Sequence, residues 1–204
     1  MKTQENTKLL QDLVRARIRS SIELKQVLLA DSAFHDLVAH VAMQIVKSLR
    51  AGGKVMFFGN GGSAADAQHL AAEFTGRYLK ERRALPALAL HANTSSLTAI
   101  GNDYGFEFVF ARQLEALGKE GDVAVGISTS GNSPNVLRAL EAAKSKSIYR
   151  VALAGKTGGR MKQLADCTIC IPSDDTPRIQ ECHILTGHLI CEIAEEMLFE
   201  PSQE

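Results

Sequence analysis

Five short apolar runs, separated from one another by segments with helical periodicity, constrain the fold of this chain more than any other feature. The runs span residues 54–59, 87–91, 123–128, 150–155 and 167–172. Runs of this length without polar alternation are typical of strands that are buried on both faces. Because helical segments connect them, we predict a five-stranded parallel sheet in a three-layer α/β sandwich.

Two helical segments precede the first strand. Apolar residues recur at helical spacing from about Thr7 to Leu29 and from about Ser32 to Ala51. No internal repeat, low-complexity tract or linker divides the chain, so we predict a single domain over residues 1–204. Residues 1–51 are expected to form a helical extension that packs on the core or on a neighbouring subunit.

Composition narrows the classes of function. The 204-residue chain has a formal net charge of zero, which argues against the basic surface of a nucleic-acid or membrane-surface binder. No run approaches the roughly 18 apolar residues of a membrane-spanning helix, and the first residues lack the apolar core of a signal peptide. We therefore expect a cytoplasmic protein whose partners are small molecules or other proteins.

The cysteines do not indicate a metal site. Cys167 and Cys170 form a C-x-x-C pattern inside the last apolar run. On a strand, residues three apart point to opposite faces, so these two thiols cannot readily share an ion. We expect them to be buried strand residues, and we expect Cys182 and Cys191 to pack within a late helix.

A glycine-rich turn and a polar helix face follow the first strand. The turn is Gly59-Asn60-Gly61-Gly62-Ser63, and Ser63 with Asp66 predicts an N-cap and capping box. From that start, one side of the helix carries Asp66, His69, Glu73 and Arg77. Such a stripe alone fits a solvated face with charge pairs. Free N–H groups at a helix N-terminus attract anions, however, so the turn favours a phosphate or polyol site beside the stripe.

A second loop closes the third strand with the sequence Ser128-Thr129-Ser130-Gly131-Asn132-Ser133-Pro134. Ser133 suits the N-cap of the next helix and Pro134 its first position. Capping leaves the other hydroxyls unexplained, whereas hydroxyls at a helix terminus are typical ligands of a phosphate monoester. The loop holds no lysine or arginine, which favours a metabolite over a nucleoside triphosphate.

Two nucleotide-binding motifs are only partly matched by this sequence. Gly155-Lys156-Thr157 resembles the end of a Walker loop, but the earlier glycine would fall at Arg150. Gly59-x-Gly61 begins a dinucleotide fingerprint whose third glycine position is occupied by Ala64. We therefore predict neither ATP nor NAD binding.

The last helix, from about Thr176, places Gln180, His183 and His188 among apolar residues. A lone histidine in such a setting is usually a core residue, so periodicity alone assigns His188 no function.

Several segments together resemble the phosphoheptose isomerases, also called sedoheptulose 7-phosphate isomerases, of the flavodoxin-like SIS (sugar isomerase) fold. They are residues 59–63, 66–69, 98–103, 126–134 and 178–181. The resemblance extends from about residue 51 to about residue 193, and the leading helices match only in character.

The resemblance implies an enzyme that converts sedoheptulose 7-phosphate to D-glycero-D-manno-heptose 7-phosphate by an enediol proton transfer. This is the first step of bacterial ADP-heptose synthesis, which supplies lipopolysaccharide. It also implies a zinc cofactor and a homotetramer with active sites near subunit interfaces. The implied zinc ligands are His69, Glu73, Gln180 and His188, of which Glu73 and His188 form the proton-transfer pair. The implied substrate-binding residues are Asn60, Gly61, Gly62, Ser63, Glu73, Asn102, Asp103, Ser128, Thr129, Ser130, Ser133 and Gln180.

Spacing leaves one geometric question open. His69 and Glu73 are four residues apart and can share an ion, but Gln180 and His188 lie about 12 Å apart along a helix. Either both side chains extend toward one ion, or one ligand comes from a neighbouring subunit.

Two alternative functions remain at this point. One is a non-catalytic SIS protein that binds the bacterial replication initiator, and the other is an isomerase or sensor for a different phosphosugar. His188 opposite Glu73 favours an enzyme, since a purely regulatory protein would not need this pair.

Overall fold

Five parallel strands form one sheet in the computed structural model, which describes residues 2–199. The strands are β1 (Val55–Gly59), β2 (Ala87–Ala89), β3 (Val123–Ser128), β4 (Tyr149–Ala154) and β5 (Cys167–Cys170), in the spatial order β2-β1-β3-β4-β5. Every neighbouring pair is parallel, which confirms the predicted sheet. The predicted domain includes residue 1 and residues 200–204, which lie outside the described residues.

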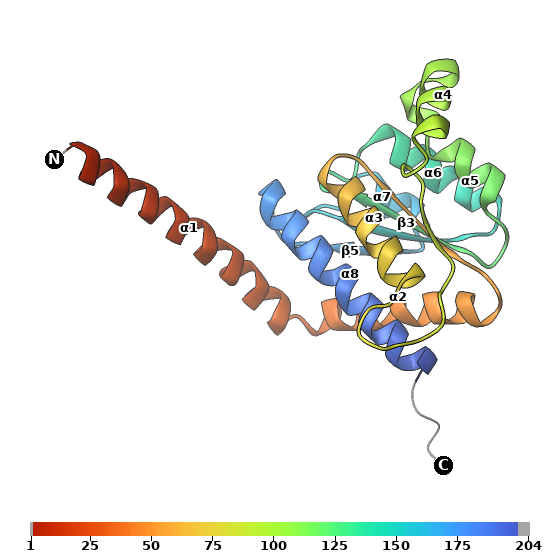
Figure 1. Ribbon diagram of the computed structural model, residues 1–204, viewed down its shortest axis with the longest axis horizontal. Helices are drawn as coiled ribbons and strands as arrows, with labels where there is room; N and C mark the ends of the chain where they lie inside the picture. Colours follow the sequence, from red (N-terminus) through yellow and green to blue (C-terminus); the bar gives the residue numbers. More distant parts are fainter. Residues whose placement is uncertain (1, 200–204) are drawn as a thin grey trace, which may run out of the picture.

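Helices cover both faces of the sheet (Figure 1). The helices after the first two are α3 (Gly62–Thr75), α4 (Thr94–Tyr104), α5 (Ala111–Leu117), α6 (Pro134–Ser145), α7 (Met161–Leu164) and α8 (Thr176–Phe199), with a short 3-10 helix at Phe106–Phe108. Successive strand residues point to opposite faces, so Phe57 packs in the core beneath α3 and α8 while Phe58 packs beneath α5 and α6. The predicted three-layer sandwich is confirmed.

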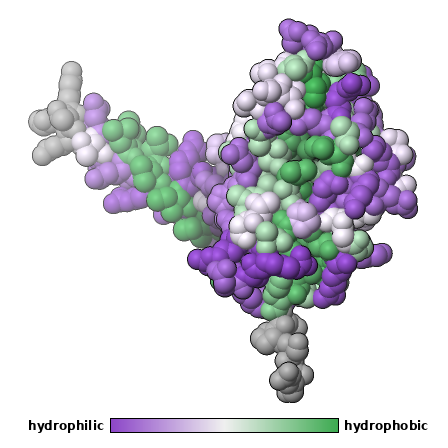
Figure 2. All heavy atoms as spheres, turned by 45° about the vertical axis from the view of Figure 1, so that its right-hand side comes forward, coloured by the Kyte–Doolittle hydropathy of each residue, from purple (hydrophilic) through white to green (hydrophobic). Residues whose placement is uncertain are grey.

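The two leading helices, α1 (Lys2–Ala30) and α2 (Ser32–Arg50), differ in their packing. Asp31 caps α2 by accepting the backbone N–H groups of Ala33 and Phe34, and α2 buries its apolar face in the sandwich. By contrast, α1 projects from the body (Figure 1), and its Leu9 and Ile18 are 69% and 57% exposed. Figure 2 shows the apolar side chains that run along this projecting helix.

The loops after β1 and β3 lie side by side at the carboxyl end of the sheet. After β1 the chain turns toward α3 on one face of the sheet, and after β3 it turns toward α6 on the other face. The strand order of the sheet therefore reverses its direction between β1 and β3. In open parallel sheets, ligands bind in the crevice at this reversal. The fold thus places the glycine-rich turn and the serine loop at one crevice.

The structure corrects the predicted start of α3. The helix begins at Gly62 and Gly61 occupies the N-cap, where its φ of 56° suits glycine. Ser63 is therefore not the N-cap: it lies buried in the first turn, and no side chain caps this helix. Arg77 was also misplaced, because α3 ends at Thr75 and Arg77 pairs with the exposed Glu81. On α6, by contrast, Ser133 and Pro134 take the predicted N-cap and first position.

Two smaller predictions concern membranes and cysteines. Within the described part of the chain, no helix combines the length and apolar character needed to cross a membrane. Cys167 is buried in the core and Cys170 is half-buried, and both thiols are free. Burial raises the pKa of both thiols.

Candidate functional site

Two glycines let α3 and α8 lie close together. A Cβ atom on Gly187 would come within 2.5 Å of Leu70 Cδ2, and one on Gly62 would come within 2.5 Å of Gln180 Nε2. Leu70 follows Gly62 along α3, and Gly187 follows Gln180 along α8. The two helices therefore run side by side in the same direction. This arrangement carries polar groups of α8 to the polar face of α3.

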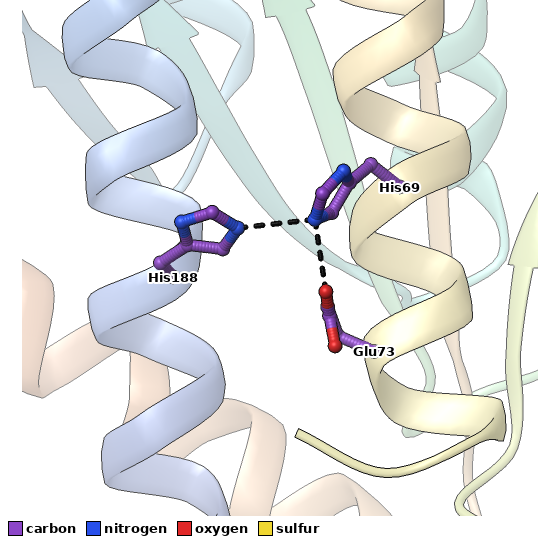
Figure 3. A group of neighbouring side chains, drawn as sticks. All are labelled: His69, Glu73 and His188. Carbon is purple, nitrogen blue, oxygen red and sulfur yellow. Dashed lines mark hydrogen bonds and ion pairs between the residues drawn. The ribbon is translucent and has the colours of Figure 1, made fainter. Parts of the chain in front are cut away.

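His69, Glu73 and His188 meet between these helices (Figure 3). His69 Nε2 lies 2.8 Å from Glu73 Oε1 and 3.1 Å from His188 Nε2. His69 and Glu73 face one another because they are four residues apart on α3. The His69 side chain is 49% exposed and that of Glu73 is 23% exposed, so the cluster is open to solvent on one side.

The cluster fits a zinc ion chemically. One ligand atom from each of the three residues lies within 4.8 Å of the others, and imidazole nitrogens with a carboxylate oxygen are typical zinc ligands. Ligand atoms around a tetrahedral zinc lie about 3.4 Å apart, given bonds of roughly 2.1 Å. The two histidine nitrogens are already near that separation. Three protein ligands would leave one position open, as in catalytic zinc sites.

Gln180 occupies a different place in this chain. Its amide lies against Gly62 at the start of α3, about two helical turns before His69. The structure thus brings together three of the four predicted metal ligands, and Gln180 lies beside the glycine-rich turn. Its role as a ligand stays a prediction.

Asp66 lies one turn before His69 on the same face of α3. Its Oδ2 atom is buried, with no hydrogen-bond partner among the described residues. Burial raises the pKa of Asp66 to about 6, although the nearby His69 opposes this shift. The carboxyl group therefore titrates in a range where exposed aspartates are fully ionised.

Three hydroxyls converge in the serine loop. Ser128 Oγ lies 2.9 Å from Ser133 Oγ and 3.4 Å from Ser130 Oγ. Ser133 occupies the N-cap, yet its hydroxyl makes no capping bond and contacts Ser128 instead. Hydroxyl donors at the N-terminus of α6 suit a phosphate group.

A pair of asparagines ties the two loops together. Asn60 Nδ2 donates to Asn135 Oδ1 at 2.9 Å, and Asn135 Nδ2 donates to Asn60 Oδ1 at 2.8 Å. Asn135 is only 3% exposed and Asn60 is half-buried, so the pair is a partly buried link between the glycine-rich turn and α6. Asn135 is absent from the residues predicted from the sequence, because nothing local to the first turn of α6 shows where its partner lies.

Lys156, which the sequence shows only within an incomplete Walker motif, also lies at the serine loop. It lines a cavity of about 260 Å³ together with Thr129 and Ser130 of the serine loop. Its Nζ atom pairs with Asp174 Oδ2 at 3.1 Å across an exposed surface. The serine loop has no cation of its own, so this neighbouring strand end supplies one.

Two predicted substrate-binding residues lie away from this crevice. Asn102 and Asp103 belong to α4, where Asn102 Nδ2 donates to Asp103 Oδ1 at 2.8 Å and both are exposed. In Figure 1, α4 stands at the far edge of the molecule from α8. A single chain therefore does not bring these two residues to the cluster.

Tyr78, which no sequence motif includes, contacts the cluster directly. Its ring stacks on the His188 ring with centroids 5.7 Å apart and an angle of 29° between the planes. His183, five residues before His188, has the opposite environment: it is 1% exposed, and burial lowers its pKa to about 4. Of these two histidines on α8, only His188 is placed for chemistry.

Comparisons with known proteins agree on one family. Residues 23–155 match the family model described as SIS domain. The chain is 52% identical over 188 residues to a phosphoheptose isomerase from Aneurinibacillus thermoaerophilus, covering 92% of this chain and 95% of the relative. It is 58% identical over 161 residues to one from Rhodospirillum rubrum, covering 79% and 86%. The structure of a phosphoheptose isomerase from Neisseria gonorrhoeae superposes with a TM-score of 0.86 at 44% identity, covering 92% and 99%.

Proposed function

This chain belongs to the phosphoheptose isomerases, a family of SIS-domain proteins, and from that premise we propose that His69, Glu73 and His188 form its zinc-dependent active site. The enzyme isomerises sedoheptulose 7-phosphate to D-glycero-D-manno-heptose 7-phosphate, the first step of bacterial ADP-heptose synthesis. The observation that carries the proposal is the meeting of two imidazoles and a carboxylate, with one ligand atom of each within 4.8 Å of the others, between α3 and α8. Zinc, when bound, polarises the substrate carbonyl and stabilises negative charge on its oxygen.

The proton transfer needs a base that reaches two adjacent carbons. Glu73 takes the proton from C1 of the ketose and returns it to C2 of the enediol, since a carboxylate can exchange a proton on one face of the substrate. His188 exchanges the protons of the O1 and O2 oxygens in the same two steps. The 2.8 Å contact between His69 and Glu73 fixes the direction of the carboxylate.

The phosphate end of the substrate is held at the serine loop. Ser128, Thr129, Ser130 and Ser133 supply hydroxyl and backbone donors at the N-terminus of α6. Asn60, Gly61, Gly62 and Ser63 line the neighbouring turn, where the Gln180 amide also lies. Binding at both ends orients C1 and C2 toward Glu73, which supplies the orientation contribution to the rate.

We further propose a cytoplasmic homotetramer. The apolar residues of α1 remain exposed within one chain, Leu9, Leu13 and Ile18 among them, and a projecting apolar helix is typical of a subunit contact. Asn102 and Asp103 lie on the exposed α4. Their predicted role in substrate binding therefore requires the active site of a neighbouring subunit. For Gln180 too, we propose the predicted role as a zinc ligand for the assembled tetramer.

Proton NMR in deuterium oxide tests the function directly. The purified protein is incubated with sedoheptulose 7-phosphate, with and without a chelator, and both aldose formation and deuterium entry at the exchanging carbon are followed. We expect turnover and deuterium entry that are lost on chelation and restored by zinc. A folded, zinc-supplemented protein with neither turnover nor exchange would contradict the proposal and favour a non-catalytic SIS protein.

A further inference from the structure

A buried carboxylate lies two turns beyond His188 on α8. Glu195 follows His188 by seven residues, which places the two on the same side of the helix. The Glu195 side chain is 3% exposed, and it pairs with the Arg82 guanidinium, which is 2% exposed. Burying such a charge pair costs free energy. The groups that Glu195 and Arg82 bind therefore show which parts of the molecule the pair holds in place.

Glu195 binds the segment that follows α3. Its carboxylate accepts the backbone N–H groups of Tyr78, Leu79 and Lys80 at 3.2, 2.7 and 2.7 Å. It also accepts Arg82 Nε at 2.8 Å. Burial would raise the pKa of Glu195, but the backbone and guanidinium hydrogen bonds outweigh it and lower the pKa below the ordinary value.

Arg82 connects the same carboxylate to the end of α3. Its NH2 group donates to the carbonyl oxygen of Glu73 at 2.7 Å, and its NH1 group donates to those of Phe74 and Gly76 at 2.9 and 3.0 Å. The last carbonyls of a helix lack partners within the helix, and a cation there is favourable. Arg82 therefore fixes the backbone that carries the Glu73 side chain.

The bound segment also reaches His188. Tyr78 is held through its own N–H group on Glu195, and its ring stacks on the His188 ring. One buried carboxylate thus supports two sides of the cluster, with Glu73 reached through Arg82 and His188 reached through Tyr78. We call Glu195, Arg82 and the backbone N–H groups of residues 78–80 the Glu195 clamp.

We propose that Glu195 is a positioning residue of the active site, and that the Glu195 clamp sets the geometry of Glu73 and His188 for zinc binding and proton transfer. The inference rests on the proposed function. A merely structural clamp would hold the segment and leave the cluster unaffected. The two roles differ in whether zinc affinity and kcat change when the clamp is loosened in a folded protein.

The test uses full-length Glu195→Gln, with Glu196→Gln as its matched control. Glu196 is the adjacent residue and pairs with Lys80 of the same segment, but its side chain is 50% exposed. Three quantities are measured: zinc affinity of the metal-free protein by competition with a chromogenic chelator, kcat and KM for sedoheptulose 7-phosphate, and hydrogen exchange at the amides of residues 78–80. For Glu195→Gln we expect faster exchange, zinc binding weakened about tenfold and kcat lowered about tenfold, with KM within about twofold. Glu196→Gln should match the wild type.

Tyr78 provides a second, milder pair of variants in case Glu195→Gln fails to fold. Tyr78→Ala removes the stacked ring, so zinc affinity and kcat should fall as they do in Glu195→Gln. Tyr78→Phe keeps the ring, so both should stay at their wild-type values. Folded Glu195→Gln with wild-type zinc affinity and kcat would overturn the positioning role alone. Folded Tyr78→Ala with wild-type values would overturn the part of that role that reaches His188. A wild-type protein that neither binds zinc nor isomerises the substrate would instead remove the proposed function, and this inference with it.

Discussion

The two ends of the proposed substrate site are held by different kinds of interaction. At the proposed zinc site, Glu73 and His188 are backed by the Glu195 clamp, a buried charge network with four donors on one carboxylate. At the serine loop, neutral hydroxyls contact one another at 2.9 and 3.4 Å, and the buried support is the neutral Asn60–Asn135 pair.

This difference matches what each end must do. Proton transfer depends on the position and charge of single groups, so a rigid charged support is useful there. Phosphate binding is shared among several donors, each of which contributes modestly. We therefore expect changes at the cluster to reduce kcat steeply, and changes at the serine loop to raise KM gradually.

The largest effect is expected for Glu73→Gln. The amide keeps the shape of the side chain but cannot accept the C1 proton, and loss of a general base typically costs about 10²–10⁴-fold in rate. We expect kcat to fall by about 10³-fold with little change in the free energy of unfolding. Steady-state kinetics and thermal unfolding measure the two, and Glu81→Gln, at a side chain 91% exposed, is the control. A variant that retained a tenth of the activity would exclude Glu73 as the base.

The next effect concerns the link between the two loops. Asn135→Ala leaves the half-buried Asn60 amide without its partner, which should lower the free energy of unfolding by about 2 kcal/mol. Because the two amides form one pair, the double variant Asn60→Ala/Asn135→Ala should cost little more than either single change. Urea unfolding of the four proteins measures this coupling. Simple additivity of the single effects would show that the pair does not join the loops energetically.

A smaller effect is expected in the serine loop. Ser130→Ala removes one exposed hydroxyl among several proposed phosphate donors, so we expect KM for the sugar phosphate to rise about tenfold while kcat changes less than about twofold. Ser145→Ala, at the far end of α6, serves as the control and should leave both constants unchanged. A fall in kcat at constant KM would contradict the division between the two ends of the site.

How far the sequence could predict this molecule depends on the range of the interactions. The strands and most helices follow from local periodicity, and the His69–Glu73 contact follows from their spacing on one helix. Ser63 failed as an N-cap because the positive φ of Gly61 starts α3 earlier, and a capping-box pattern cannot reveal that conformation. His188 was predicted as a site residue only from the family resemblance, because its partner His69 is 119 residues away in the sequence.

The supporting residues were harder still to predict. Arg82 and Glu195 are 113 residues apart in the sequence, and Asn60 and Asn135 are 75 apart. Each is an ordinary polar residue in its local context. Their importance arises only when the parallel approach of α3 and α8, or the reversal at β1 and β3, brings the partners together. Local patterns therefore predicted the α3 half of the site, the family resemblance added His188, and tertiary packing determined what supports both.

The smallest effect concerns Asp66, whose pKa is raised to about 6 chiefly by burial. A carboxyl group with a raised pKa favours its protonated form in the folded state, so its contribution to stability is present below about pH 4 and is lost as the pH rises through 6. Asp66→Asn mimics the protonated form. Two pKa units correspond to about 3 kcal/mol, but Asp66 is only half-buried, and solvent screening reduces the expected gain to about 1 kcal/mol. Urea unfolding of the metal-free protein should therefore show Asp66→Asn more stable than the wild type at pH 8 and equal to it at pH 4. The exposed control Asp36→Asn should show no such difference, and an Asp66→Asn gain that is independent of pH would exclude titration of Asp66 as its cause.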